Sequence, residues 1–232
     1  VHIETPRVRV TALLTDVRSS LIIWSKRFLG EVEGFADIVN DITQAIVGEL
    51  RIQVLPHNWA SIRDRRPHDP QAYALYLQVR PGIYRRRRPA LERALRQAEK
   101  CMDIVGENEI LLALVGEIHL KFLEGSMDPN PRHIDEVRRC IDRVFAINPE
   151  SGPGYFLSGY LHYRHARLQK AVYDFKKGLE REPDSPDILA HLVMTYVISG
   201  QIAAAEPLLE RLLMIDPLTP LNHFWRGHTA MS

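Results

Sequence analysis

The sequence predicts a mainly α-helical fold: a superhelix of helix-turn-helix units, preceded by a small partial α/β segment made of a β-hairpin and a helix. Proline recurs at Pro149, Pro183 and Pro217, each time after Asn, Glu or Asp, so the spacing is 34 residues twice over. Amphipathic helical patterns fill both intervals. A repeat of this length is typical of stacked supersecondary units rather than of an ordinary helical bundle.

The α/β part is predicted by a change of periodicity near the start of the chain. Residues 7–28 alternate as two strands around a turn at Arg18, Ser19 and Ser20, and the apolar face of the first strand consists of Val8, Val10, Ala12 and Leu14. Residues 34–55 then change to helical spacing. A hairpin and one helix are too little for an independent sheet domain, so we expect further sheet residues upstream.

Residues 151–184 carry a recognisable helix-pair pattern. Its members are Tyr155, Gly159, Ala171, Phe175 and Pro183, and the following segment repeats it with Leu189, Leu192, Tyr196, Ala205 and Pro217. Small residues let two helices approach closely, and proline ends a helix. The pattern resembles the tetratricopeptide repeat (TPR), which implies a binding module for other polypeptides. Departures are Ser158 for leucine, His162 for tyrosine, Gly178 for alanine and Val193 for glycine.

We expect three divisions of the chain. Residues 1–55 form the partial α/β segment, 56–70 a linker rich in proline, histidine and arginine, and 71–232 the repeat array. The copies are predicted at 71–106, 107–150, 151–184 and 185–218, with a partial copy at 219–232. The second copy is about nine residues too long, and the excess is predicted in the loop between its helices. The last copy lacks its second helix, which predicts exposed apolar surface at that end.

The first segment resembles the end of a TolB-like amino-terminal domain. The resemblance rests on residues 7–14, on residues 23–28 with the pattern Trp-Ser-Lys-Arg-Phe, and on the amphipathic run 38–46. In bacterial signalling proteins this domain precedes TPR arrays, behind a class III cyclase, a serine/threonine kinase or a winged-helix domain. The resemblance therefore implies a catalytic or DNA-binding head upstream. The apolar start of the second strand, Leu21, Ile22 and Ile23, predicts a covered strand.

Positive charge gathers between residues 56 and 100, where eleven Lys or Arg stand against four Asp or Glu. The candidate anion-binding residues are Arg63, Arg65, Arg66, Arg85, Arg86, Arg87 and Arg88. Such a patch is typical of contacts with nucleic acid or membrane phosphates. We favour a solvated loop whose arginines pair with the acidic segment 101–150, because no aromatic stacking partners or nucleic-acid motif accompany them.

Signals for catalysis, cofactors and metals are missing from the sequence. Gly152, Pro153 and Gly154 lack the lysine or third glycine of a phosphate loop, and no serine elbow or paired-cysteine site occurs. His119, His162 and His165 invite a metal hypothesis, but no carboxylate or cysteine of the pattern completes it, so packed histidines are favoured. Cys101 and Cys140 lie on apolar helix faces and are expected to be core thiols. We expect neither an enzyme nor a cofactor in these residues.

The groove of the array is the predicted partner-binding surface. The resemblance implies that the first helix of each repeat lines its concave side. The side chains placed there are Ala113, Glu117, Leu120, Lys121, Phe156, Tyr160, Tyr163, Arg164, Ala190, Met194, Val197, Phe224 and His228. This groove is predicted to be aromatic and apolar with few charges, which suits a segment anchored by apolar side chains. The alternative role for each of these residues is ordinary packing between repeats. The alternative occupant of the groove is the chain's own α/β segment.

Three functions remain open at this point. The leading hypothesis is a non-catalytic protein–protein interaction scaffold of a bacterial signalling or regulatory protein. The second is the regulatory region of a cyclase or kinase whose catalytic domain lies upstream, and the third is an arginine-rich anion-binding module. A protein or peptide is the expected partner, nucleic acid is disfavoured, and a homodimer is an open alternative. No apolar run is long enough to cross a membrane, which predicts a cytoplasmic protein, or an extracytoplasmic one if a span precedes it.

Overall fold

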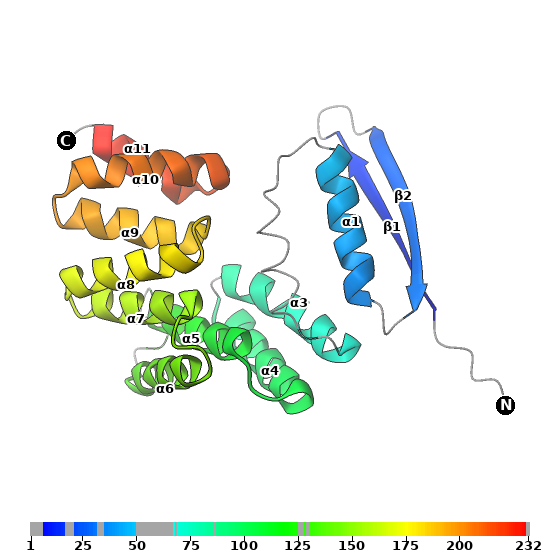
Figure 1. Cartoon of the computed structure of the whole chain (residues 1–232), viewed down its shortest axis with the longest axis horizontal. Helices are drawn as coiled ribbons and strands as arrows, with labels where there is room; N and C mark the ends of the chain where they lie inside the picture. The colour runs from blue at the N-terminus through cyan, green and yellow to red at the C-terminus, as the bar shows by residue number, and fades with distance from the viewer. Residues whose placement is uncertain are drawn as a thin grey trace.

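The computed structural model describes residues 7–16, 21–31, 35–49, 67, 69–85, 87–124, 128 and 130–230. In this part of the chain a two-stranded hairpin and one helix precede nine helices that stack side by side (Figure 1). The expectation of a mainly helical superhelix preceded by a small α/β segment is confirmed. Helix α1 contacts β2 on one side and α3 on the other.

The hairpin pairs β1 (Arg7–Thr15) with β2 (Ile22–Glu31) in antiparallel register, with Val10 opposite Phe28. Val8, Val10, Ala12 and Leu14 alternate with exposed residues, as the period of two predicts. The second strand runs three residues beyond its predicted end because it continues to pair as far as Arg7. Helix α1 (Phe35–Glu49) covers one face, where Ile38 lies so close to Gly30 that any side chain there would collide with it. Predicted helical residues after 49 lie outside the described chain.

The apolar start of the second strand is not covered. Leu21, Ile22 and Ile23 are 65%, 61% and 59% exposed, so the expectation of a covered strand is wrong for the described residues. The reason is the size of the sheet: two strands have α1 on one face, and no described element packs on the other.

The array consists of helix pairs with short connections, except for the longer connection between α5 and α6. Its helices are α3 (Pro70–Tyr84), α4 (Arg88–Val105), α5 (Glu109–Leu123), α6 (Arg132–Ile147), α7 (Gly152–Arg164), α8 (Leu168–Arg181), α9 (Pro186–Ile198), α10 (Ile202–Ile215) and α11 (Pro220–Ala230). Side-chain caps begin several of them: Asp69, Asn108 and Ser151 each accept a hydrogen bond from the backbone N–H three residues on. The division of the chain into an α/β segment, a linker and five repeat copies stays a prediction.

Small residues set the distance between helices where the repeat pattern places them. A Cβ atom on Gly116 of α5 would lie 2.6 Å from Cδ1 of Leu157 on α7, and one on Gly159 would lie 2.7 Å from the ring of Phe175 on α8. Both gaps are too short for any side chain. The glycines therefore let the helices pack against bulky residues of their neighbours. Cys101 and Cys140 are free and buried, as expected.

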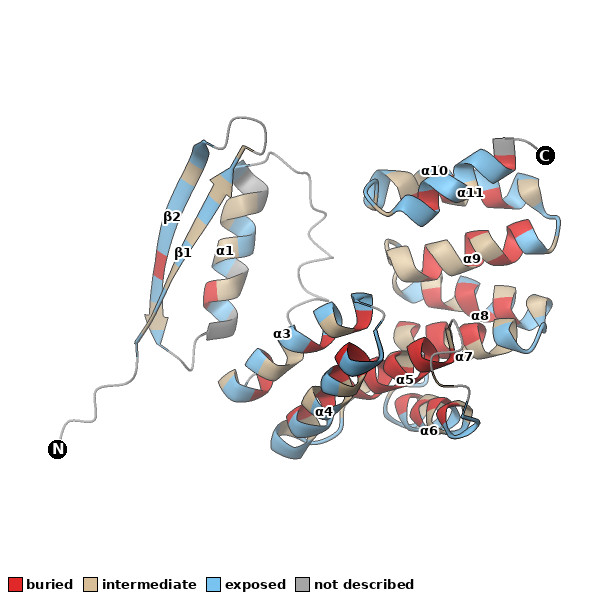
Figure 2. Ribbon diagram, turned by 180° about the vertical axis from the view of Figure 1, so that it is seen from behind, coloured by how far each residue is buried: buried red, intermediate tan, exposed pale blue. Residues whose placement is uncertain are grey.

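Helix α5 forms the centre of the array. It contacts α3, α4, α6 and α7, and most of its side chains are buried (Figure 2). From Leu111 to Leu123 every residue except Glu117 is buried. One carboxylate therefore interrupts an otherwise buried run, and its surroundings form part of the candidate site.

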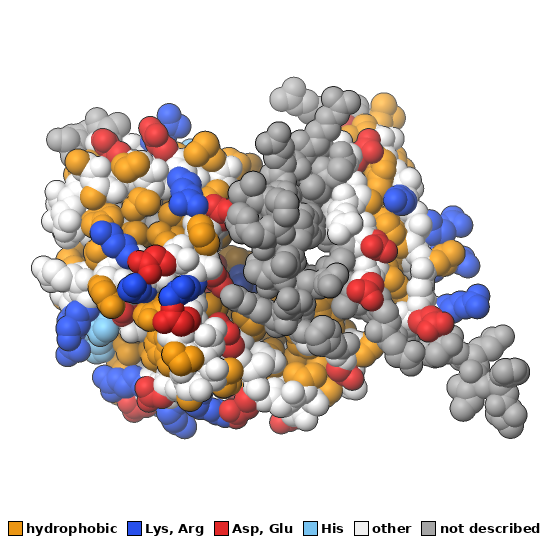
Figure 3. All heavy atoms as spheres, viewed as in Figure 1, with side chains coloured by type: hydrophobic (Ala, Val, Ile, Leu, Met, Phe, Trp, Pro, Cys, Tyr) orange, Lys and Arg blue, Asp and Glu red, His pale blue; other side chains and the backbone are white. Residues whose placement is uncertain are grey.

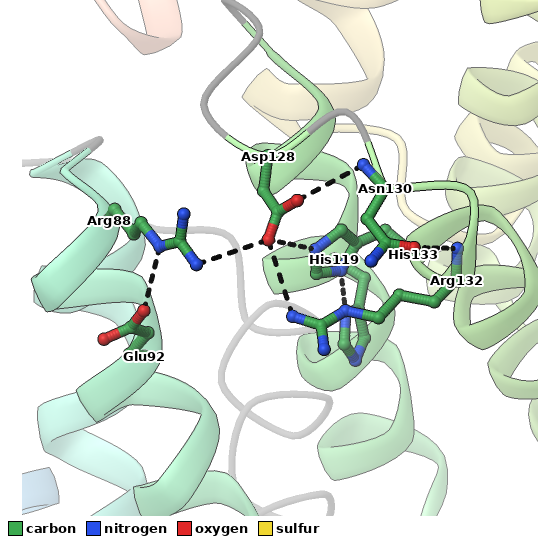
Figure 4. A network of polar contacts seen from close by, with 7 residues as sticks. All are labelled: Arg88, Glu92, His119, Asp128, Asn130, Arg132 and His133. Atoms are coloured by element: carbon green, nitrogen blue, oxygen red, sulfur yellow. Dashed lines mark hydrogen bonds and ion pairs between the residues drawn. The ribbon is translucent and has the colours of Figure 1, made fainter.

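On the opposite side of α5 a polar network ties the second helices together (Figure 4). Asp128, in the connection between α5 and α6, lies 3.5 Å from Arg88 of α4, 3.4 Å from Arg132 and 3.3 Å from Nε2 of His133. The Nδ1 atoms of His133 and His119 lie 2.8 Å apart. Contact with His133 lowers the pKa of Asp128. The long connection in the second copy is thus held to helices on both sides.

Candidate partner-binding groove

The first helices of the repeats line an open pocket. Four helices contribute to it: α3, α5, α7 and α9. Its floor and walls are formed by Ile110, Ala113, Leu114, Pro153, Phe156, Ser185 and Ile188, and its charged groups are Arg80, Glu117, Glu182 and Asp187. The pocket therefore combines an apolar surface with several charges, which is typical of a specific binding site.

Glu117 of α5 is one of the carboxylates that line this pocket. Burial raises its pKa to about 7, and the negative charge of Asp187 adds to the effect, while Arg80 and Lys121 oppose it. Among the described residues, no hydrogen bond or ion pair reaches the Glu117 carboxylate. The groove thus holds a carboxyl group whose charge is poorly compensated at neutral pH.

Arg80 reaches the pocket from α3, where its Nη1 atom lies 3.9 Å from Oδ2 of Asp187 on α9. Burial works against its charge, but the surrounding groups, led by Glu117, raise the pKa of the Arg80 guanidinium. Arg80 therefore stays charged and lies between two carboxylates that come from different repeats. Both partners are partly exposed, so the ion pair adds little stability.

A second polar cluster borders the pocket. Glu124 Oε1 accepts hydrogen bonds from Lys121 Nζ at 2.8 Å and from the Tyr160 hydroxyl at 2.6 Å. Burial, followed by the Glu124 charge, raises the pKa of Tyr160. The Lys121 ammonium also lies 5.9 Å from the Tyr160 ring centroid. Lys121 is thus already engaged by its own helix and by α7.

Aromatic rings pack across the repeat boundary beside these charges. The ring of His191 on α9 lies 5.2 Å from that of Phe156 and 4.9 Å from that of Tyr160. Its Nδ1 atom donates to the backbone carbonyl of Asp187 at 2.7 Å. Burial lowers the pKa of His191, so the imidazole is neutral at neutral pH. These contacts fix α9 against α7.

The predicted groove residues fall into three groups. Six of them are buried: Ala113, Leu120, Lys121, Phe156, Tyr160 and Val197. Four are partly buried: Glu117, Tyr163, Ala190 and Met194. Three are exposed: Arg164, Phe224 and His228. Of this set, Ala113, Glu117 and Phe156 line the pocket. Phe224 and His228 lie near each other on α11, with ring centroids 6.4 Å apart, and are not among the residues that line it.

Arg80, Asp187 and His191 were not among the predicted groove residues. Arg80 lies on α3, in the first and weaker copy, from which the predicted groove set contains no residue. Asp187 lies in the first turn of α9, three residues before Ala190, the first residue of that helix in the predicted groove set. The expected groove with few charges is therefore more highly charged in the structure, since the pocket alone is lined by four ionisable residues.

The arginine run is only partly visible. Arg63, Arg65, Arg66 and Arg86 lie outside the described residues, and Arg85 and Arg87 are exposed at the turn between α3 and α4. Arg88 pairs with Glu92 at 3.0 Å and with Asp128 at 3.5 Å, so one arginine pairs as expected with the acidic segment. On the visible face of the array, acidic and basic side chains are interspersed (Figure 3).

The histidines of the metal hypothesis have other contacts. Nδ1 of His162 lies 2.9 Å from Oδ2 of Asp174, which also accepts a hydrogen bond from Ser158 at 2.6 Å, and His119 contacts His133. Within the described ranges, no three His, Cys, Asp or Glu side chains are placed to hold a metal ion. In the same part of the chain, no helix combines the length and apolar character needed to cross a membrane.

Helix pairs of this length, joined by short turns and packed through glycines at fixed positions, are the geometry that the TPR resemblance predicts. Residues 163–221 match the tetratricopeptide repeat family model. This stretch includes α8, α9 and α10, three of the four helices that lie within the two 34-residue intervals. No curated protein matches the chain.

Solved structures resemble the chain over most of its length. TTC0263, a thermophilic TPR protein of Thermus thermophilus, is 15% identical with a TM-score of 0.53, and the alignment covers 84% of this chain and 91% of that one. YrrB, a TPR protein with an unusual peptide-binding site, is 16% identical with a TM-score of 0.43 over 84% and 90%. MamA of Desulfovibrio magneticus RS-1 is 15% identical with a TM-score of 0.42 over 81% and 97%. The likeness to TTC0263 shows the fold of the chain and says nothing of its partner.

Proposed function

We propose that the chain is a non-catalytic protein–protein interaction scaffold whose TPR groove binds a segment of another protein. The observation that carries this proposal is the pocket between α3, α5, α7 and α9, because it places an apolar floor beside charged groups from three of these helices and is open to solvent. Apolar side chains of a bound segment would supply most of the binding free energy, and the charged groups would fix its position.

The proposal extends to the context of the scaffold. The resemblance of residues 1–55 to the end of a TolB-like domain supports a bacterial signalling protein in which this array transmits or gates the action of another domain. In that arrangement the chain is the regulatory region of a cyclase or kinase, and catalysis takes place outside these residues. Sequencing of the coding region upstream of Val1 tests this context directly.

Site-specific photo-crosslinking tests the groove as the binding surface. A benzophenone amino acid is placed at Tyr163, which is partly buried on α7, and in a control protein at Tyr173, which is 61% exposed on α8. Both positions carry tyrosine, so the two substitutions are chemically matched. Alanine substitution of Phe156 or Tyr160 is less suitable, because both side chains are buried in the array.

In lysate of the source cells we expect a discrete crosslinked partner from position 163 and none from position 173. The same adduct from both positions, or no adduct from position 163, would contradict a groove-bound partner. Thermal unfolding of the two labelled proteins checks that both are folded.

A further inference from the structure

The pocket in the groove has an excess of negative charge. The ionisable residues that line it are three carboxylates, Glu117, Glu182 and Asp187, and one cation, Arg80. The nearby ammonium of Lys121 does not correct this balance, because it is bound to Glu124 at 2.8 Å. Even without Glu182, which has an interaction of its own, two carboxylates, Glu117 and Asp187, still stand against the single guanidinium of Arg80.

Glu117 is the group that most needs a cation. It is the one residue between Leu111 and Leu123 that is not buried, so its side chain lies at the opening of an apolar helix face. Arg80 is closest to Asp187 at 3.9 Å, and no ion pair within 4 Å joins any described cation to Glu117. A partly buried carboxylate without an ion-pair partner loses part of its solvation uncompensated, and a positive group beside it would supply that compensation.

We propose that Glu117 and Asp187 bind a lysine or arginine side chain of the partner segment, while an apolar side chain beside it packs on Ile110, Phe156 and Ile188. This inference rests on the proposed function and specifies the partner chemistry. An acidic segment or a carboxylate terminus would meet net repulsion in the same pocket. A purely apolar segment would cover Glu117 without compensating its charge.

The two parts of this site come from separate repeats. Glu117 lies on α5 and Asp187 at the start of α9, while Phe156 on α7 lies between them. A cation between the two carboxylates would therefore bridge α5 and α9, whereas the ion pair of Arg80 with Asp187 joins α3 to α9. The site exists only when the repeats are stacked, so it is a property of the folded array.

Selection from a phage library of random dodecapeptides tests the inference with the whole chain. The unmodified chain and the variants Glu117→Gln and Asp187→Asn are used in parallel, together with Lys177→Gln as a control whose charge lies on the outer helix α8. Enriched peptides are synthesised, and their dissociation constants are measured by calorimetry. Thermal unfolding confirms that each variant is folded.

We expect enriched peptides to contain lysine or arginine next to an apolar residue. Replacement of that basic residue by glutamine, or the Glu117→Gln change in the protein, should weaken binding about 10- to 100-fold, because a charge-assisted hydrogen bond is lost from a largely desolvated site. Lys177→Gln should leave the dissociation constant within about twofold. A peptide in which glutamate replaces the basic residue should bind the Glu117→Lys variant more tightly than it binds the unmodified protein.

Two results would overturn the inference. Peptides that compete for the groove but lack a basic residue, and that tolerate Glu117→Gln, would show that the groove binds a different chemistry while the proposed function stands. Selection that yields no peptide dependent on groove residues would contradict the proposed function itself. The two failures are therefore distinguishable in one experiment.

Discussion

A Cβ atom on Gly159 would lie 2.7 Å from the ring of Phe175, so the contact between α7 and α8 leaves no room for a side chain. Phe175 is fully buried in the core of the array and cannot move without opening it. The glycine of the TPR pattern is therefore required by a particular partner ring. Ser158, one residue earlier, donates a hydrogen bond to Asp174 at 2.6 Å and holds the same two helices together.

Gly159→Ala is expected to destabilise the chain by about 1–3 kcal/mol, because overpacking of a filled core exceeds the gain in helix propensity. Gly227→Ala is the matched control. It also replaces a glycine within a helix, but nothing lies within 4 Å of the added Cβ, so it should stabilise by up to about 1 kcal/mol. Chemical denaturation of both variants measures the difference. Equal destabilisation by the two changes would contradict the close contact as the cause.

Glu117→Gln is expected to stabilise the chain above pH 7. The folded-state pKa of Glu117 is about 7 against an ordinary value of 4.5, so the native state binds the proton more tightly. Stability is therefore lost as the pH rises from about 4.5 to 7, by up to about 3 kcal/mol. The variant should remove this loss, which thermal unfolding at pH 5 and pH 8 would detect. A variant less stable than the parent at pH 8 would show that Glu117 is compensated in the fold. Stability given up at this position is typical of a binding site.

The histidine pair in the network of Figure 4 predicts the opposite pH dependence. Burial, with the neighbouring His133, lowers the pKa of His119 to about 4. Below the unfolded value of about 6.5 the unfolded state takes up the proton and the native state does not, so stability falls between about pH 6.5 and 4, by at most about 3 kcal/mol. Urea unfolding at pH 7 and pH 5 measures the effect. The free energy of unfolding should fall less between these two pH values for the His119→Gln variant than for the parent chain. If the variant and the parent lose the same free energy of unfolding between pH 7 and pH 5, ionisable groups other than His119 cause the loss.

Binding of a lysine-containing peptide to the groove should weaken as the pH falls below about 7, because protonation removes the Glu117 charge. The other ionisable groups that influence this carboxyl are Arg80, Lys121, Glu124 and Asp187, and His191 stands beside Asp187. Calorimetry with the selected peptide at pH 8, 7 and 6 measures the effect. Glu117→Gln should bind weakly with little change over this range. If the affinity of the parent chain for the peptide does not change with pH, the lysine of the peptide does not bind next to Glu117.

The sequence by itself determined the periodic features of this protein. The double 34-residue spacing predicted helix pairs, and the alternation of Val8, Val10, Ala12 and Leu14 predicted a strand. The repeat pattern placed the small residues Gly159 and Ala171 where helices pack closely. These features depend on interactions within one repeat or between consecutive ones. Local pattern is sufficient for them because helix and strand periods fix which side chains share a face.

Only the tertiary structure decided the chemistry of the groove. Arg80, Glu117 and Asp187 come from three separate repeats, and no local period relates them, so their proximity depends on how far each pair is rotated in the stack. The same is true of Leu21, Ile22 and Ile23, whose exposure depends on what covers a sheet rather than on the strand itself. Burial and charge balance are properties of neighbours in space, and the stacking of helices sets them.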